Sequence, residues 1–103
     1  MIRIEITREN GHIVYLSAKG HALSDEEGKD LVCAAISAII TGGLNALDNP
    51  KSFGIILEKG YASISSLKDV NNHDYEVLDV IYTQLKTVEE DNKKYIKIVE
   101  KGC

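Results

Sequence analysis

The run from Leu31 to Leu47 is apolar on nearly every side of a helix, and it constrains the fold more than any other segment. Its apolar members are Leu31, Val32, Ala34, Ala35, Ile36, Ala38, Ile39, Ile40, Leu44, Ala46 and Leu47. A helix of this kind must be covered on more than one side. In a chain of 103 residues a sheet can cover one side and little remains for the other, so we expect a second subunit to pack helix against helix. Gly42 and Gly43 either permit a close approach there or only weaken the helix.

Alternating apolar and polar residues predict two strands before this helix. The apolar positions are Ile2, Ile4 and Ile6 in the first strand, and Val14, Leu16 and Ala18 in the second. A two-residue hairpin loop at Asn10-Gly11 would put the two apolar sets on opposite faces. A three-residue loop from Glu9 to Gly11 sets Ile6 opposite Val14, so we predict this loop, with Gly11 in the left-handed conformation.

The rest of the chain predicts a second hairpin, a second helix and a last strand. Phe53 to Glu58 and Tyr61 to Leu67 pair through a turn at Lys59-Gly60, with Leu57 opposite Ala62 and Ile55 opposite Ile64. Asn71 or Asn72 caps a helix from about His73 to Glu90, and Tyr95 to Val99 is the last strand. The apolar stripe of that helix consists of Val77, Leu78, Ile81, Leu85 and Val88. Residues 1–103 therefore predict one α+β domain of order β-β-α-β-β-α-β, with two helices packed on a mainly antiparallel sheet.

Charge and composition narrow the range of partners. The formal net charge of −4 argues against a nucleic-acid surface, which usually has a basic face. Two cysteines do not make a disulfide framework, and the N-terminus opens directly into a strand rather than a signal peptide. No apolar run approaches the roughly 18 residues of a membrane span. We expect a cytoplasmic protein without direct contact to nucleic acid or membrane.

Cys33 and His21 are the residues that point to chemistry. The second strand should end near Gly20, which leaves His21 free to project into the space that the following loop encloses. Asp30 is typical of an N-cap, and this puts Cys33 at the third helical position, where free amides and the helix dipole lower the pKa of a thiol. A histidine within reach would take the thiol proton and later protonate a leaving amine. Spacing alone does not separate this pair from a small apolar core cysteine and a polar histidine that ends a strand.

Two short motifs carry a resemblance to a known family. Gly20-His21-Ala22, followed by Asp30-x-Val32-Cys33-Ala34-Ala35-x-Ser37, resembles the signature of the ribosomal-processing cysteine protease family Prp, and the similarity extends to the length and the order of elements. The resemblance implies an endopeptidase that removes the N-terminal extension of large-subunit ribosomal protein twenty-seven, cutting after an aromatic residue. It implies that Cys33 is the nucleophile, that His21 is the base, and that the protein forms a homodimer through helices.

Other residues near the motif have two interpretations each. Asp30 either orients His21 or only caps the helix. Ser37 lies one turn after Cys33 on the same face, where a packing role competes with a role in the site. The loop from Ala22 to Lys29 either orders over a bound peptide or is an ordinary surface loop. Candidates for the pocket that takes an aromatic side chain are Leu31, Val32 and the strand Tyr61 to Leu67.

The remaining histidines and the second cysteine predict no further chemistry. We expect His12 to be exposed, His73 to be structural and Cys103 to be an exposed thiol at a frayed end. Their spacing is not that of a zinc site, so no metal and no cofactor are expected. A rival hypothesis is a non-catalytic protein that holds a ribosomal protein tail during assembly. A thiol redox protein is disfavoured because the chain lacks a Cys-x-x-Cys motif.

Overall fold

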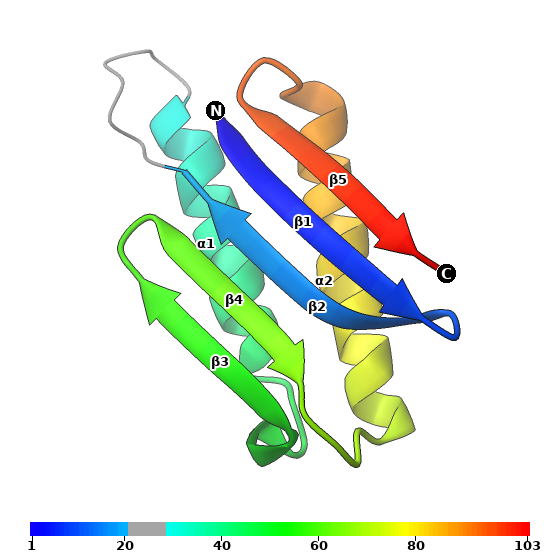
Figure 1. Ribbon diagram of the computed structural model, residues 1–103. Helices are drawn as coiled ribbons and strands as arrows, with labels where there is room; N and C mark the ends of the chain where they lie inside the picture. Colours follow the sequence, from blue (N-terminus) through cyan, green and yellow to red (C-terminus); the bar gives the residue numbers. More distant parts are fainter. Residues whose placement is uncertain (21–28) are drawn as a thin grey trace.

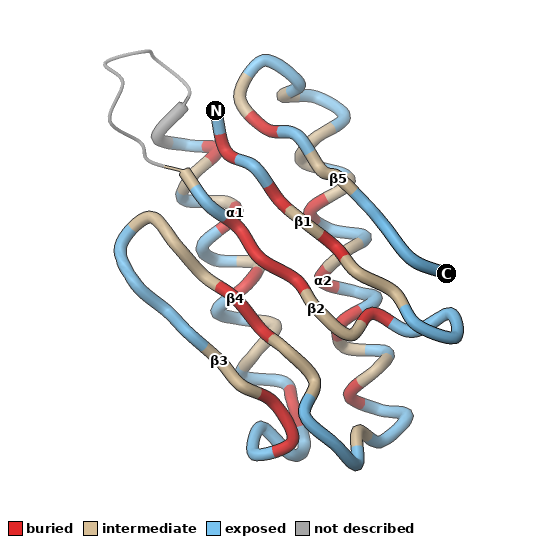
Figure 2. The backbone as a smooth tube through the Cα atoms, in the orientation of Figure 1, coloured by how far each residue is buried: buried red, intermediate tan, exposed pale blue. Residues whose placement is uncertain are grey.

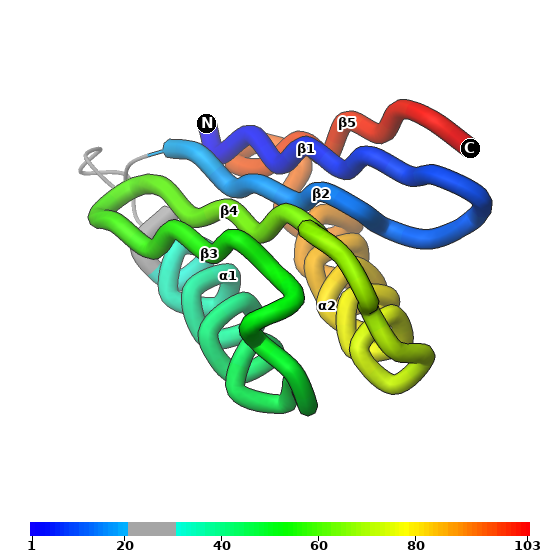
Figure 3. The backbone as a smooth tube through the Cα atoms, turned by 60° about the horizontal axis from the view of Figure 1, so that its bottom comes forward, coloured from blue at the N-terminus to red at the C-terminus, as the bar shows by residue number. Residues whose placement is uncertain are grey.

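One face of a five-stranded sheet carries both helices (Figures 1 and 3). The computed structural model describes residues 1–20 and 29–103. The elements in chain order are β1 (Ile2–Glu9), β2 (His12–Lys19), α1 (Lys29–Leu44), a short 3-10 helix (Pro50–Ser52), β3 (Phe53–Glu58), β4 (Tyr61–Ser66), α2 (Asn72–Asp91) and β5 (Ile96–Gly102). The strand order is β3-β4-β2-β1-β5, and β5 pairs with β1 in parallel while the other pairs are antiparallel. The predicted α+β fold, its element order and its mainly antiparallel sheet are confirmed.

The core lies between the sheet and the two helices, as the buried positions in Figure 2 show. Apolar side chains at alternate strand positions face the helices, because successive residues of a strand point to opposite faces. The most deeply buried members are Ile4, Ile6, Ile13, Leu16, Leu78, Ile81, Leu85 and Ile96. The predicted stripe of α2 is confirmed at Leu78, Ile81 and Leu85, while Val77 and Val88 pack against the core from its margin.

The first hairpin differs from the prediction. Its loop has two residues, since Glu9 pairs with His12, and both Asn10 and Gly11 have positive φ values of 53° and 81°. These values are those of a type I′ turn. A bulge after Thr7, where Val14 is the extra residue, then shifts the register so that Ile6 lies opposite Leu16. The buried face of β2 therefore carries Ile13, Leu16 and Ala18, and the prediction that Val14 belongs to this set is wrong.

The second hairpin and the start of α2 agree with the prediction. Leu57 pairs with Ala62 and Ile55 with Ile64, across the two-residue turn at Lys59 and Gly60. Asn71 caps α2, since its side-chain oxygen accepts a hydrogen bond of 2.8 Å from the amide of Asp74. The last strand begins one residue later than expected and extends to Gly102.

Two sides of α1 are covered within the chain itself, and a second subunit on the remaining face stays a prediction. One face of α1 lies on the sheet, and α2 packs beside it (Figure 3). Gly43 makes this neighbour possible, because a Cβ at that position would collide with the side chain of Ile81. The close approach that the glycine pair suggested is therefore an approach of α1 to α2, while Gly42 faces open space. Leu31 is 75% exposed, and the other exposed residues between positions 31 and 44 are Ala34, Ser37, Ala38, Thr41 and Gly42.

The start of α1 also needs a correction. The helix begins at Lys29 rather than Leu31, so Asp30 is its second residue and not the predicted N-cap. Cys33 is the fifth residue of the helix instead of the third. The influence of free amides and of the helix dipole falls off after the first turn, and it is therefore weaker at Cys33 than predicted.

The chain's other histidine and cysteine positions are more ordered than the sequence indicated. His12 is exposed as expected, but its ring stacks on Tyr75 with 3.9 Å between the ring centroids. Cys103 is exposed, yet its carbonyl accepts a hydrogen bond of 2.7 Å from the amide of Gly11, so the chain end is not frayed. In the described part of the chain, neither helix is long and apolar enough to cross a bilayer.

Candidate active site

Cys33 lines a pocket beside α1. The pocket has a volume of about 350 Å³ and lies between α1 and the end of the β3–β4 hairpin. The helix contributes Cys33, Ile36, Ser37, Ile40 and Thr41, and the hairpin contributes Leu57, Glu58, Lys59, Gly60, Tyr61 and Ala62. Ile2, Ala18 and Gly20 complete the lining. Cys33 is only partly buried, so its thiol lies at the wall of a space that a ligand can enter.

Gly20 fixes the end of β2 against this pocket. Its φ of +152° is a conformation that favours glycine, and a Cβ would lie 2.9 Å from the carbonyl oxygen of Met1. Its amide donates a hydrogen bond of 3.0 Å to the carbonyl of Gly60 in the hairpin turn. The residue that precedes His21 is thus tied to the opposite wall of the pocket. Glycine is therefore favoured at this position of the first motif because a larger residue would collide with the backbone of Met1 and Ile2.

The predicted site residues fall into three groups. Cys33 and Ser37 line the same pocket, one helical turn apart. His21 and the loop from Ala22 to Gly28 lie outside the described residues. Asp30 lies in the first turn of α1, on the same helix as Cys33. The roles of His21, Cys33, Asp30 and Ser37 remain predictions.

The residues suggested for binding an aromatic side chain only partly coincide with the lining of the Cys33 pocket. Leu31 is exposed, and Val32 is buried in the core, so neither lines the pocket. Of the strand Tyr61 to Leu67, only Tyr61 and Ala62 line it. Sequence reasoning missed the segment 57–60, because its place beside Cys33 depends on the pairing of β4 with β2. The hydrogen bond between Gly20 and Gly60 has no signal in a single sequence.

Polar groups at the hairpin end shape the electrostatics of the pocket mouth. Glu58 and Lys59 bring one charge of each sign to its lining. A hydrogen bond with Tyr15 lowers the pKa of Tyr61, and a second one with Ser63 acts in the same direction. Because successive strand residues point to opposite faces, the Tyr61 side chain lies on the sheet face opposite that of Ala62 and Leu57.

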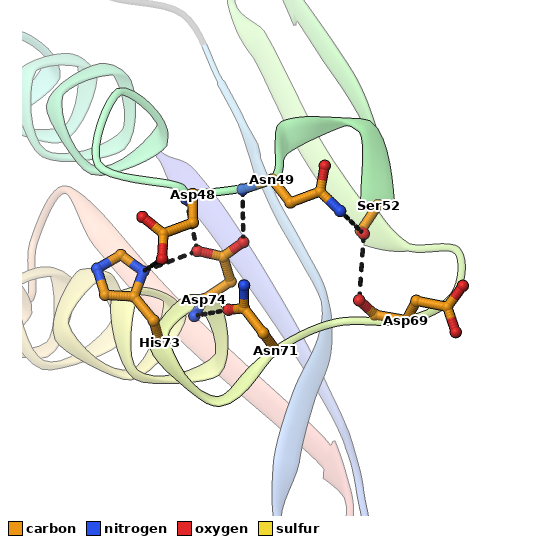
Figure 4. A network of polar contacts seen from close by, with 7 residues as sticks. All are labelled: Asp48, Asn49, Ser52, Asp69, Asn71, His73 and Asp74. Carbon is orange, nitrogen blue, oxygen red and sulfur yellow. Dashed lines mark hydrogen bonds and ion pairs between the residues drawn. The ribbon is translucent and has the colours of Figure 1, made fainter.

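A second polar cluster lies at the other end of α1 and is separate from the pocket (Figures 1 and 4). Asp74 is completely buried, and its two carboxylate oxygens accept hydrogen bonds from the amides of Asp48 (2.7 Å) and Asn49 (3.0 Å). Nδ1 of His73 lies 2.9 Å from Asp74 and 3.2 Å from Asp48. Within the described chain, these three side chains bring possible ligand atoms within 4.8 Å of one another. Because the Asp74 oxygens already hold two backbone amides, we assign the cluster a structural role, joining the end of α1 to the start of α2.

The pKa shifts in this cluster agree with that role. Burial would raise the pKa of Asp74, but the hydrogen bonds from Asp48, His73 and Asn49 outweigh it and the pKa is lowered. The hydrogen bond with Asp74 raises the pKa of His73 against the opposing effect of burial, and the charge of Asp48 adds to the rise. A charged His73 therefore gains from two carboxylates, which the sequence analysis did not anticipate.

Comparisons with known proteins bear on both the sequence and the fold of the chain. Residues 1–97 match the family described as cysteine protease Prp. A protein of Mycoplasma genitalium named ribosomal processing cysteine protease Prp is 39% identical over 103 residues, covering 99% of this chain and 98% of that protein. A protein of the same name from Staphylococcus aureus is 29% identical over 108 residues, covering 95% of this chain and 97% of its own length.

Solved structures point the same way. The crystal structure of the S. aureus protease Prp in complex with a substrate peptide matches with a TM-score of 0.86 and 29% identity, covering 98% of this chain and all of that one (100%). The structure of the same protease with a covalently linked product peptide matches with a TM-score of 0.81, also at 29% identity and over 98% of this chain and 100% of that one. The agreement covers the sheet, both helices and the segment that holds Cys33. This chain therefore belongs to the Prp family of cysteine proteases.

Proposed function

We propose that this protein is an endopeptidase that removes the N-terminal extension of large-subunit ribosomal protein twenty-seven, cutting after an aromatic residue. The observation that carries the proposal is the position of Cys33, a partly buried thiol at the wall of an open pocket. Two further observations support it. The relatives in M. genitalium and S. aureus are named ribosomal processing proteases, and the S. aureus structure contains a substrate peptide.

In the proposed mechanism Cys33 and His21 divide the work. The Cys33 thiolate attacks the scissile carbonyl carbon, which gives a tetrahedral oxyanion and then a thioester as the C–N bond breaks. His21 protonates the departing amine and then takes a proton from the water that hydrolyses the thioester. Cys33 lies one turn into α1, so the helix start lowers its pKa less than a first-turn position would. The proposal therefore relies on His21 as the main activator of the thiol.

Asp30 and Ser37 have supporting roles in this proposal. Asp30 lies in the first turn of α1, where a carboxylate stabilises the helix and can also orient His21. Ser37 shares the pocket with Cys33 and offers a hydroxyl to the bound peptide. The loop from Ala22 to Lys29, which connects His21 to α1, is proposed to contact the substrate.

The oligomer and the location of the protein are part of the same proposal. We propose a cytoplasmic homodimer whose contact includes the exposed face of α1. The support is that this face carries small residues, such as Ala34 and Ala38, which allow a second helix to approach closely.

Mass spectrometry of one peptide tests the proposed activity. The peptide spans the N-terminal extension of the host's ribosomal protein and is incubated with the wild-type protein and with Cys33→Ser. We expect one cut after an aromatic residue with the wild type, and a loss of rate of at least about a thousandfold with Cys33→Ser. The conservative variant keeps the shape of the pocket, so binding of the uncut peptide to it serves as the control. Binding without any cleavage by the wild type would contradict the proposal and favour a protein that only holds the tail.

A further inference from the structure

The two edge strands of the sheet, β5 and β3, differ in how they are protected against pairing with another strand. At the β5 edge, the amide of Ile98 donates a hydrogen bond of 2.7 Å to Oε2 of Glu89, which belongs to α2. The strand itself also carries three charged side chains, those of Lys97, Glu100 and Lys101. Side chains that cap edge amides and charges along the strand are how natural sheets prevent pairing with other chains. The β5 edge is thus closed to a further strand.

The β3 edge has neither protection. Among residues 1–20 and 29–103, β3 pairs only with β4. Its sequence from Phe53 to Leu57 contains no charge and no proline, and the first charge is Glu58 at its end. Ile56 and Leu57 are 47% and 54% exposed, which is high for large apolar side chains. An open, apolar edge of this kind is a site for the addition of an extended chain.

The register of the second hairpin decides which backbone groups the edge presents. Glu58 pairs with Tyr61 across the two-residue turn, so Glu58 and Ile56 exchange their hydrogen bonds with β4. The amides and carbonyls of Ile55 and Leu57 therefore point away from the sheet. The side chains of these two residues face the helices, and Leu57 lines the pocket that also holds Cys33.

We propose that the substrate binds as an added β-strand along the outer edge of β3, hydrogen-bonded to the backbone of Ile55 and Leu57. This inference rests on the proposed endopeptidase function. The edge is continuous with the Cys33 pocket at Leu57, and this continuity favours the substrate as the occupant. A substrate residue paired with Leu57 has its side chain on the helix side of the sheet, where the pocket opens. Every second substrate side chain faces that side, while the backbone contacts accept any sequence.

A scan of the substrate backbone tests this binding mode. Versions of the extension peptide, each methylated at one amide nitrogen, are titrated against Cys33→Ser and offered to the wild type for cleavage. Methylation at alternate residues should weaken binding about tenfold or more, because each such residue loses a hydrogen bond and brings a methyl group against the edge. Methylation at the intervening residues should change binding by no more than about twofold. A profile without this alternation would overturn the proposal.

Two variants of the chain test the same contact from the other side. Ile55→Pro removes an outward amide without breaking the bonds between β3 and β4, which is the setting in which strands accept proline. We expect it to raise KM about tenfold while the particle mass stays unchanged. The matched control is Ile56→Thr, whose amide is bonded to β4 and whose side chain lies on the opposite face, and it should keep the wild-type KM.

The outcomes separate this inference from the function on which it rests. Cleavage of the parent peptide with a flat methylation profile would overturn only the binding mode. A lower particle mass for Ile55→Pro, together with a flat profile, would show that a second copy occupies the edge. If the parent peptide is neither bound nor cut, the proposed function fails, and the binding mode fails with it. Should Ile55→Pro not fold, the methylation profile of the unaltered edge decides the question.

Discussion

Asp74 shows how one side chain joins two segments that are distant in sequence. Its carboxylate holds the amides of Asp48 and Asn49, and it is completely buried (Figure 4). Asp74→Ala leaves these donors without their acceptor and should lower the free energy of unfolding by about 2–3 kcal/mol. Asp74→Asn keeps one oxygen and should fall between the wild type and the alanine variant. Urea unfolding measures the order of the three proteins.

The control for this prediction is a carboxylate on the same helix. Asp91 is an exposed residue at the far end of α2, so Asp91→Asn should change the unfolding free energy by less than about 0.5 kcal/mol. Equal effects at Asp74 and Asp91 would contradict the role of Asp74 in linking the end of α1 to the start of α2.

His73 makes the contribution of this link to the stability of the protein depend on pH. Its pKa is raised above the ordinary value of 6.5 in the folded protein, so its contribution is fully present below that value and is lost as the pH rises through the raised pKa. The pKa of Asp74 is lowered below 3.8, so its contribution is present above that value and is lost as the pH falls through the lowered pKa. The combined contribution of His73 and Asp74 to stability is therefore largest between these two ordinary pKa values.

A comparison with His73→Gln tests this pH dependence. The wild type should be more stable than His73→Gln at about pH 5.5, and the difference should be smaller at about pH 8.5, because protons leave the imidazole as the pH rises through its raised pKa. Urea unfolding at both values measures it. A difference that is the same at both values would show that His73 contributes through packing alone.

At the scale of elements, adjacent glycines in α1 have opposite structural settings. A Cβ at Gly42 would meet nothing within 4 Å, whereas a Cβ at Gly43 would collide with Ile81, which is only 2% exposed. Gly42→Ala should raise the free energy of unfolding by about 0.5–1 kcal/mol, because alanine is the better helix former. Gly43→Ala gains the same helix propensity but forces the two helices apart, and it should lower the free energy by about 1–3 kcal/mol.

Each glycine variant serves as the control for the other, since both make the same chemical change in the same helix. Thermal unfolding of the two proteins at one pH measures the difference. Two shifts of the same sign would contradict the account of the contact between α1 and α2.

At the scale of the whole molecule, the proposed homodimer brings the exposed face of α1 into contact with a second copy. Ala38 is an exposed residue of α1, and a glutamate there would place a charge in the proposed contact between subunits. We expect the wild type to have twice the mass of the chain by light scattering, and Ala38→Glu to have the mass of one chain. The control is Thr83→Glu, at an exposed position of α2, which should keep the wild-type mass. A wild-type protein with the mass of one chain would contradict the proposed homodimer.

Local patterns in the sequence determined much of the fold. The alternation in β1, the turn at Lys59 and Gly60, and a cap at Asn71 or Asn72 each depend on residues close in the chain, and each was predicted. The two-part motif around Cys33 identified the family for a similar reason, because it consists of residue types at short fixed spacings. Patterns of this kind express the preferences of the backbone and of one face of an element.

The tertiary structure decided what depends on distant segments. The bulge at Val14, the contact of Gly43 with Ile81, and the place of the β3–β4 hairpin beside Cys33 all follow from the sheet order and from the position of α2. The physical reason is that a helix or a strand has only a pattern of faces in its sequence. Which segment covers each face is settled by packing the whole chain around one core.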